Sequence, residues 1–350
     1  MNNQSQFNYV ARYWEKAGPD HIVCHLCPRA CRLAEGQRGF CFVRQNMGQQ
    51  LVLTAYGRTS GFCVDPIEKK PLNHFFPGSS VLSFGTTGCN LGCRFCQNWD
   101  LSRSREQERL STTASPQAIA RRARELECRG VAFTYNEPVI SAEYAIDTAQ
   151  ACHDAGIKTV AVTAGYIVGQ ARQDFFQFMD AANVDLKSFS EEFYREYCQG
   201  ALQPVLDTLV YLKKETSVWI EITTLLIPGG NDSEDEISRM TEWIVHNLGA
   251  DVPLHLTAFH PAYRLMDLPV TPKDVLKRSR RIAKAQGVRH VYTGNICDPE
   301  GSSTYCHSCG QCVIARLGYQ ISGYHLMNGN QCAFCGAECA GIFPVNNGKE

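Results

Sequence analysis

The stretch VLSFGTTGCNLGCRFC, residues 81–96, joins a short apolar run to a loop with three cysteines in the spacing C-x3-C-x2-C. The apolar residues 81–87 are typical of a buried parallel strand. A loop that directly follows such a strand lies at the carboxyl edge of its sheet, where the functional groups of α/β proteins gather. This stretch therefore predicts an α/β fold with a site at that edge.

The same alternation of strand and helix continues to residue 296. Further apolar runs that predict buried strands are 130–135, 158–166, 183–189, 218–228, 252–259 and 290–295. Ser115 and Pro116 predict the start of one helix, and Ser233 with Glu236 predicts a capping box at the start of another. Repeated strand–helix units predict an open or closed α/β barrel.

Cysteine is the unusual component, with 18 residues in a chain of 350. Residues 1–14 are polar and lack the apolar core of a secretory signal, and no stretch approaches the ~18 apolar residues of a membrane span. We therefore expect a cytoplasmic chain with no membrane association, in which clustered, reduced cysteines bind metal. The net charge of −1 does not indicate nucleic acid as a partner.

The cysteine loop predicts an iron–sulfur cluster. Three thiolates, from Cys89, Cys93 and Cys96, can ligate three irons of a [4Fe–4S] cube and leave the fourth iron open. Zinc normally recruits four ligands in two pairs, so the spacing argues against a zinc site, and the position after a strand argues against three unrelated thiols. The amino and carboxylate groups of S-adenosylmethionine can chelate an open iron, and Phe95 is placed to pack beside the adenine.

At these residues the sequence resembles the radical SAM superfamily, in particular its pyruvate formate-lyase-activating-enzyme-like branch. The whole chain resembles the AmmeMemoRadiSam system radical SAM enzymes, through LCPRACRLAEGQRGFCFVRQN (26–46), TYNEP (134–138) and a tail with paired cysteines. The resemblance implies a partial (β/α)6 barrel, which we place over residues 79–299. The cysteine patterns on either side predict a Cys-rich N-terminal extension over 1–78 and a small zinc-ribbon-like module over 300–350. The resemblance also implies reductive cleavage of S-adenosylmethionine to a 5′-deoxyadenosyl radical.

The resemblance further implies which residues contact the cofactor. Tyr135, Asn136 and Glu137 end the second strand where relatives carry Gly-Gly-Glu, a motif whose backbone oxygen holds the methionine amine, and we expect Asn136 and Glu137 to contact the cofactor. Asp185 and Lys187 match an Asp-Leu-Lys motif that contacts the ribose and the carboxylate. A carboxylate suits a diol because it accepts two hydroxyl protons, and an ammonium suits a carboxylate.

The tail contains two knuckles of the form C-x2-C-G, which predict a zinc site made by Cys306, Cys309, Cys332 and Cys335. Two further cysteines, Cys312 and Cys339, are surplus. They can pack, exchange with a ligand or turn the site into an iron–sulfur cluster.

Residues 1–75 show no persistent helical or strand period, so we expect an irregular segment. It carries a candidate second metal site in the spacing C-x2-C-x3-C-x9-C, formed by Cys24, Cys27, Cys31 and Cys41. The sequence allows three interpretations of these four cysteines: a zinc site, an auxiliary iron–sulfur cluster or free structural thiols. Isolated cysteines are expected to be small buried apolar side chains, namely Cys63, Cys128, Cys152, Cys198 and Cys297, with Cys41 as a sixth candidate.

The leading functional hypothesis is radical generation for hydrogen abstraction from a substrate, with a macromolecule as one option. The first alternative is activation of a glycyl-radical enzyme, and the second is a non-enzymatic iron–sulfur electron carrier or metal scaffold. The first two require an electron donor such as flavodoxin or ferredoxin. The family resemblance also suggests protein partners of the Memo and AMMECR types.

Overall fold

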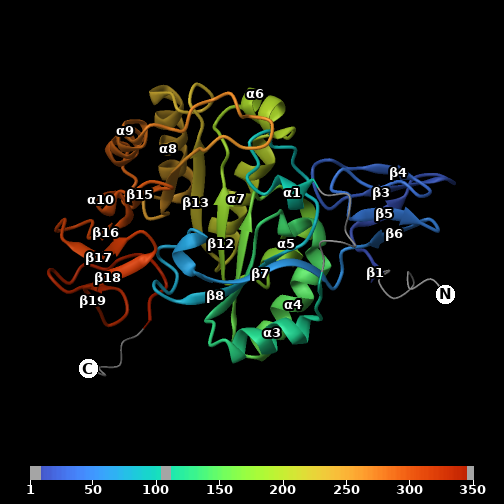
Figure 1. The fold of residues 1–350 in the computed structure, drawn as a ribbon, viewed down its shortest axis with the longest axis horizontal. Coiled ribbons are helices and arrows are strands. Elements are labelled where there is room, and N and C mark those ends of the chain that lie inside the picture. The colour runs from blue at the N-terminus through green and yellow to red at the C-terminus, as the bar shows by residue number, and fades with distance from the viewer. Residues whose placement is uncertain (1–8, 104–111, 345–350) are drawn as a thin grey trace.

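A nine-stranded sheet forms the centre of the computed structural model, which describes residues 9–103 and 112–344 (Figure 1). Its strands, in spatial order, are β15 (Val291–Gly294), β14 (Leu254–Ala258), β13 (Trp219–Leu226), β12 (Ala181–Asp185), β11 (Lys158–Thr163), β10 (Gly130–Phe133), β8 (Ser80–Gly85), β7 (Arg58–Pro66) and β9 (Thr112–Thr113). Strands β8 and β10 to β15 pair in parallel, whereas β7 runs antiparallel to both β8 and β9. Residues of β10 and β14 are buried throughout, as expected for strands covered on both faces.

The seven apolar runs of the sequence all become parallel strands of this sheet, so the predicted α/β class is confirmed. The sheet is open, with β15 and β9 at its edges, and a closed barrel is excluded. The count of six strands taken from the family resemblance is one too few. Most of the predicted runs extend too far at their carboxyl ends, because residues such as Tyr135, with a φ of 71°, already belong to turns.

One main helix lies in each crossover between parallel strands. The main helices are α3 (Pro116–Glu125), α4 (Ala142–Asp154), α5 (Gly169–Phe176), α7 (Gln203–Glu215), α8 (Glu234–Leu248) and α9 (Lys273–Ala285). Short elements are α1 (Trp99–Ser102), α6 (Glu191–Phe193), α10 (Pro299–Ser302), the 3₁₀ helices η2 (Ile67–Lys69) and η3 (Pro138–Ser141), and a π-helical turn, η4 (Tyr194–Cys198). The helices flank the central sheet (Figure 1).

The predicted capping residues are found at the starts of their helices. The Ser115 hydroxyl accepts a hydrogen bond from the amide of Ala118, 3.2 Å away, and Ser233 caps α8 in the same way. The capping box is only half formed, because the carboxylate of Glu236 instead accepts hydrogen bonds from Ser188 and from the backbone of Phe189. Glu236 therefore ties α8 to the segment after β12.

The N-terminal segment is not irregular, contrary to expectation. It forms two three-stranded antiparallel sheets, composed of β1 (Tyr9–Val10), β6 (Gln50–Leu53) and β5 (Arg44–Met47), and of β2 (Trp14–Lys16), β3 (His21–Cys24) and β4 (Arg32–Ala34). Strands of two to four residues are too short to show a period in the sequence. The same segment contributes β7 to the central sheet.

The C-terminal module lies at the opposite side of the central sheet from the N-terminal sheets (Figure 1). It contains a three-stranded sheet of β16 (Thr304–Tyr305), β17 (Cys312–Leu317) and β18 (Gln320–Tyr324), and a hairpin of β19 (Leu326–Met327) and β20 (Gln331–Cys332). A small apolar cluster around Val313, Ile314 and Phe343 forms its own core.

The isolated cysteines divide into two groups. Cys128, Cys152 and Cys198 are buried, as expected. Cys63 and Cys297 are exposed, so the prediction that they are buried is wrong: Cys63 lies where β7 shifts register, and Cys297 follows the last parallel strand. In the part of the chain that the structure describes, no helix combines the length and the apolar composition required to span a bilayer.

A buried ion pair joins the N-terminal sheets to the helical layer. Arg44 and Glu143 are 1% and 0% exposed, and Nη2 of Arg44 lies 2.5 Å from Oε2 of Glu143. The second carboxylate oxygen accepts the amide of Arg12, and Nε of Arg44 donates to the carbonyl of Ile140. The pair is thus supported by further hydrogen bonds on both sides, as a buried charge pair requires.

We expect Glu143→Gln to lower the free energy of unfolding by about 3–5 kcal/mol, because it leaves the Arg44 guanidinium buried without a counter-charge. Denaturant titration of the purified protein measures this change. The matched control is Glu125→Gln, which removes the exposed partner of Arg122 and should cost less than about 1 kcal/mol. Equal effects of the two substitutions would contradict a structural role for the buried pair.

Candidate active site at the carboxyl edge of the sheet

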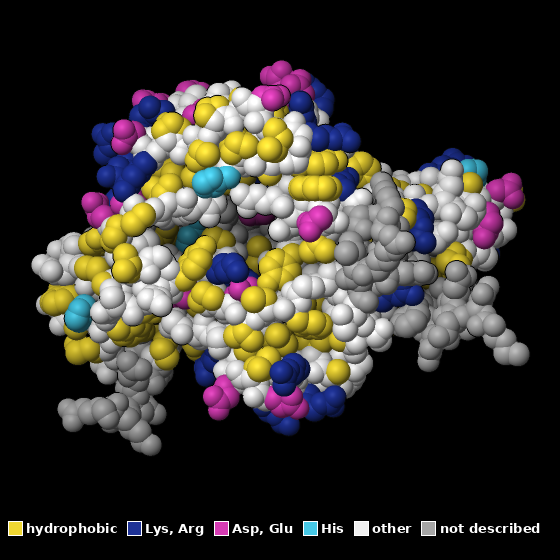
Figure 2. Space-filling model, in the orientation of Figure 1, with side chains coloured by type: hydrophobic (Ala, Val, Ile, Leu, Met, Phe, Trp, Pro, Cys, Tyr) yellow, Lys and Arg dark blue, Asp and Glu magenta, His cyan; other side chains and the backbone are white. Residues whose placement is uncertain are grey.

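A cavity of about 340 Å³ opens at the carboxyl ends of the parallel strands, a size typical of small-molecule sites. Its lining includes all three cysteines of the C-x3-C-x2-C loop together with Glu137, Asp185 and Lys187. In the space-filling view a hollow lies in the middle of the face, bordered by hydrophobic side chains (Figure 2). The structure therefore brings residues from separate strand ends into one chamber.

The cysteine loop is fixed by backbone hydrogen bonds to its surroundings. The amide of Gly88 donates to Leu101 in α1 (3.0 Å), that of Gly92 to Cys198 (2.7 Å) and that of Arg94 to Tyr197 (2.8 Å) in η4. Gly88 has a φ of 91°, and a Cβ there would lie 2.1 Å from the carbonyl oxygen of Cys41. Only glycine fits this close approach of the N-terminal segment.

The three thiols differ in their neighbours. Sγ of Cys89 accepts the amide of Leu91 at 3.4 Å, and Cys96 lies 3.6 Å from the hydroxyl of Ser102. Cys93 lies next to the thiol of Cys198, which together with burial raises the pKa of Cys93. Burial also raises the pKa of Cys89 and of Cys96. Cys198 was expected to be a small buried core residue. Its isolated position in the sequence does not indicate the contact with Cys93.

Asn136 braces the cysteine loop with its side chain. Its Oδ1 accepts the amide of Thr86 at 2.9 Å, and its Nδ2 donates to the hydroxyl of Thr86 and to the carbonyl of Gly88. Tyr135 adopts the left-handed conformation, with a φ of 71°, at the position that corresponds to the first glycine of the family's Gly-Gly-Glu motif. The phenol of Tyr135 is anchored on Asp65 at 3.0 Å, and its carbonyl accepts a hydrogen bond from Asn98.

Glu137 follows the end of β10 and connects it to the end of β11. Its carboxylate accepts hydrogen bonds from the hydroxyl of Thr163 and from the amides of Ala164 and Val139. Burial raises the pKa of Glu137 to about 7, although these hydrogen bonds act in the opposite direction. Glu137 is therefore a hydrogen-bonded carboxyl group that titrates near neutral pH.

Asp185 and Lys187 lie at the end of β12 and form an ion pair, with 2.5 Å between Nζ and Oδ2. Burial alone lowers the pKa of Lys187, but the nearby Asp185 and Cys93 outweigh it and raise the pKa. A ligand that carries an anionic group can therefore bind the ammonium only by sharing it with Asp185. The amide of Lys187 is fixed on the hydroxyl of Tyr194 at 3.0 Å.

Phe95 is 4% exposed and lines the cavity. Its ring lies 5.9 Å from that of Phe193, at 45°. The ring thus forms part of the apolar wall between the cysteine loop and α6.

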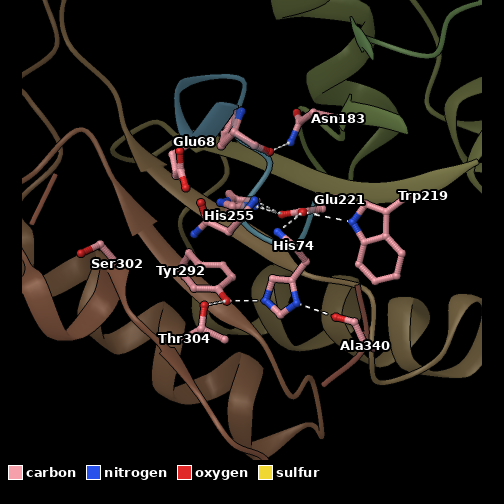
Figure 3. Close-up of polar contacts among 12 residues, drawn as sticks. Glu68, His74, Asn183, Trp219, Glu221, His255, Tyr292, Ser302, Thr304 and Ala340 are labelled. Atoms are coloured by element: carbon pink, nitrogen blue, oxygen red, sulfur yellow. Dashed lines mark hydrogen bonds and ion pairs between the residues drawn. The ribbon is translucent and has the colours of Figure 1, made fainter. Parts of the chain in front are cut away.

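A buried polar network that sequence reasoning missed meets the cavity through His255 and Tyr292 (Figure 3). Nε2 of His255 lies 2.6 Å from the carboxylate of Glu221, which also accepts the amides of Asn73 and His74. His74 continues the network through a 2.5 Å contact to the hydroxyl of Tyr292. Burial lowers the pKa of His74 to about 4. These residues come from β13, β14, β15 and the loop before β8, so no local motif marks them.

The C-terminal module forms one wall of the cavity. Arg316 is buried and donates to Thr304 at 2.7 Å and to the carbonyl of Asn73 at 2.8 Å, while Tyr319 lies at the rim. Nε of Arg316 also faces Glu68 at 3.6 Å. The module is therefore part of the chamber rather than a separate appendage.

The four tail cysteines predicted to bind zinc have sulfurs that lie within 4.8 Å of one another. The sulfurs of Cys306 and Cys335 are 3.6 Å apart, and those of Cys309 and Cys332 are 3.8 Å apart. A Zn–S bond of about 2.3 Å gives a tetrahedral ligand separation of about 3.8 Å. The structure thus contains a group of four cysteines with the spacing that one tetrahedral ion requires.

The surplus Cys339 lies away from this group. Its sulfur is 3.9 Å from Nδ1 of His74, and with His290 these residues form a second group of buried donor atoms. Both ring nitrogens of His74 are engaged, Nδ1 with the carbonyl of Ala340 and Nε2 with Tyr292. This group therefore acts as a polar junction between the tail and the sheet.

The N-terminal cysteines also come together. Cys24, Cys27, Cys31 and Cys41 all line one small cavity, which also reaches Asn90 of the cysteine loop.

Comparisons with known proteins match the region of the chain that contains this site. A family profile described as the Radical SAM superfamily matches residues 84–241, which include the three-cysteine loop. An uncharacterized protein of Methanocaldococcus jannaschii is 36% identical over 327 residues, covering 93% of this chain and 97% of that protein. The pyruvate formate-lyase 1-activating enzyme of Escherichia coli K12 is 23% identical over 233 residues, covering 62% of this chain and 93% of that enzyme.

Among solved structures, the crystal structure of a radical SAM methyltransferase from Sphaerobacter thermophilus is similar in fold, with a TM-score of 0.51 and 15% identity. The similarity covers 87% of this chain and 81% of the methyltransferase. At this identity the comparison concerns the fold alone.

The raised pKa of Glu137 predicts a specific pH dependence. The folded protein holds the carboxyl proton up to about pH 7, whereas the ordinary pKa is 4.5. The metal-free wild type should therefore lose stability relative to Glu137→Gln as the pH rises from about 4.5 to about 7, by on the order of 3 kcal/mol. Denaturant titrations across this window measure the difference. A constant difference between the two proteins would contradict the assignment.

Proposed function

Because the chain belongs to the radical SAM superfamily, we propose that it binds a [4Fe–4S] cluster through Cys89, Cys93 and Cys96 and cleaves S-adenosylmethionine reductively there. The observation that supports this proposal is that all three thiols line one cavity with Glu137, Asp185 and Lys187. Three cysteines of the loop face this cavity, which fits a cube with one iron left free for a ligand. Bound together and reduced, the cofactors supply a 5′-deoxyadenosyl radical that abstracts hydrogen.

The protein side of this chemistry is binding and orientation. Lys187 offers an ammonium for the methionine carboxylate, and Asp185 offers a carboxylate for the ribose hydroxyls. The ion pair between them holds both side chains in place before a ligand arrives. The side-chain amide of Asn136 is occupied by the cysteine loop, so its backbone is the part available to the cofactor. Phe95 provides an apolar surface for the adenine.

The rim favours a substrate carried by a macromolecule. Tyr319 lines the cavity and is 49% exposed, and Trp99, next to the lining residue Asn98, is 48% exposed and stacked on Tyr263. Exposed aromatic side chains around a cavity mouth are typical of surfaces that bind another macromolecule.

A second candidate is activation of a glycyl-radical enzyme, which is favoured by the similarity to the E. coli activating enzyme. This function requires a partner that presents a glycine loop to the cavity mouth. Incubation of the reduced protein with S-adenosylmethionine and deuterated candidates separates the two functions, because the label enters 5′-deoxyadenosine only from the true hydrogen donor.

Membership of a superfamily of enzymes argues against the hypothesis of a non-enzymatic iron–sulfur electron carrier. Membership of the AmmeMemoRadiSam group, with partners of the Memo and AMMECR types, stays a prediction from resemblance.

We also propose that the four-cysteine group of the tail binds zinc and so forms a zinc-ribbon-like module. The glycines after the two knuckles, Gly310 and Gly336, have φ values of 75° and 76°. The module has only a small apolar core, so a metal would supply much of its folding free energy.

We expect Cys93→Ala to abolish formation of 5′-deoxyadenosine, because the cluster would lose one of its three thiolates. Chromatography of anaerobic reactions with dithionite measures this product. Cys152→Ala, which removes a buried thiol from α4 far along the chain from the loop, is the control and should retain cleavage. Cleavage at the wild-type rate in Cys93→Ala would refute the site.

Cys335→Ser should lower the zinc content by about one ion per chain and make the tail sensitive to protease, while the iron content stays unchanged. Metal analysis and limited proteolysis measure both effects. Loss of iron from the cysteine loop in this variant would contradict a separate tail site.

A further inference from the structure

We propose that Cys24, Cys27, Cys31 and Cys41 bind a second iron–sulfur cluster, a [4Fe–4S] cube with four protein ligands. This inference goes beyond the proposed function and does not depend on it. All four cysteines line the same small cavity, which they share with Gly39 and the buried Arg44. Three of the four side chains are buried, so these cysteines are not a chance group on the surface.

The backbone holds these four thiols close to one another. Cys24 ends β3, and its amide bonds to the carbonyl of Cys31 at 3.0 Å, which closes the C-x2-C-x3-C segment into a loop. Gly39 lies beside the last two cysteines: a Cβ there would be 3.7 Å from the sulfur of Cys31 and 3.8 Å from that of Cys41. The fourth cysteine is thus brought to the loop by a turn farther along the chain.

Amide groups point at the sulfurs of this set. The thiol of Cys24 faces the amide of Leu26, that of Cys27 the amide of Arg29, and that of Cys41 the amides of Val43 and Arg44. Amides placed near thiolates in this way can form the N–H···S hydrogen bonds that stabilise the ligands of iron–sulfur clusters.

The N-terminal thiols are less tightly grouped than the tail tetrad, which argues against one shared zinc ion. In the described parts of the chain, the sets of ligand atoms that lie within 4.8 Å of one another include the tail tetrad but no three of these N-terminal thiols. The thiols of the three-cysteine loop, Cys89, Cys93 and Cys96, are not such a set either. Each thiolate of a cube binds a different iron and is therefore farther from its neighbours than the ligands of one zinc ion. No three of the described N-terminal thiols are as close together as the four ligands of the tail, which favours a cluster over one zinc ion.

Four thiolates would leave no iron free, so this cluster would not bind S-adenosylmethionine. Its cavity reaches Asn90, the residue after Cys89, and the carbonyl of Cys41 packs against Gly88. The guanidinium of Arg29 donates to the carbonyls of Asn90 and Gln199. The second cluster would therefore share a wall with the loop of the first.

The test uses full-length protein, reconstituted and handled without oxygen. We expect about eight irons and eight sulfides per chain, in two clusters. The triple variant Cys89→Ala, Cys93→Ala, Cys96→Ala should keep about four irons and, after dithionite, show a cluster signal in electron paramagnetic resonance that S-adenosylmethionine does not change. An iron-free triple variant, or zinc in place of iron in the N-terminal site, would overturn the proposal.

A second variant tests the proposal independently, in case the triple variant does not fold. Cys31→Ser changes the one half-buried thiol of the set and should halve the iron content while the signal that responds to S-adenosylmethionine remains. Cys128→Ser, a buried cysteine outside both cavities, is the control and should keep all the iron. An unchanged iron content in Cys31→Ser would overturn the proposal. If the wild type contained about four irons and the triple variant kept all of them, the iron would lie only in the N-terminal site. This result would contradict the proposed function and agree with the present inference.

Discussion

The site depends on holding a loop that has little regular structure of its own. Residues 88–98 carry the three thiols, and their backbone is fixed by hydrogen bonds to α1 and to the π-helical turn η4. A ligand set for a metal cluster must be positioned closely, because each thiolate has to reach its own iron. The neighbouring elements are therefore arranged around the loop: Asn136 anchors its start, and Arg29 donates to the carbonyls of Asn90 in the loop and of Gln199 after η4.

The charged side chains in and around the chamber compensate one another. Asp185 and Lys187 neutralise each other, Glu221 is paired with His255, and Glu137 is a carboxyl with a pKa of about 7. Burial makes isolated charges costly, so each is held by a partner or by a proton. A zwitterionic ligand that brings both an amine and a carboxylate can exchange with these pairs without leaving any charge unpaired.

Much of this architecture was predictable from the sequence, because the parallel strands are long apolar runs and the three-cysteine loop is a local motif. The tail tetrad was predictable for the same reason, since its ligands come in two short knuckles. The N-terminal sheets were not, because strands such as β2 and β4 are only three residues long. Cys198 and the Glu221–His255 pair were also missed, since their partners lie far away in sequence and only the folded sheet brings them together.

The wall contributed by the tail has a consequence for the order of assembly. Arg316 and Tyr319 border the chamber, yet they are synthesised only after every strand of the central sheet. A nascent chain can thus complete its sheet while the chamber still stands open on one side. Insertion of the inorganic cofactor during translation would have a wide entrance, which the last module would narrow when it packs against the sheet.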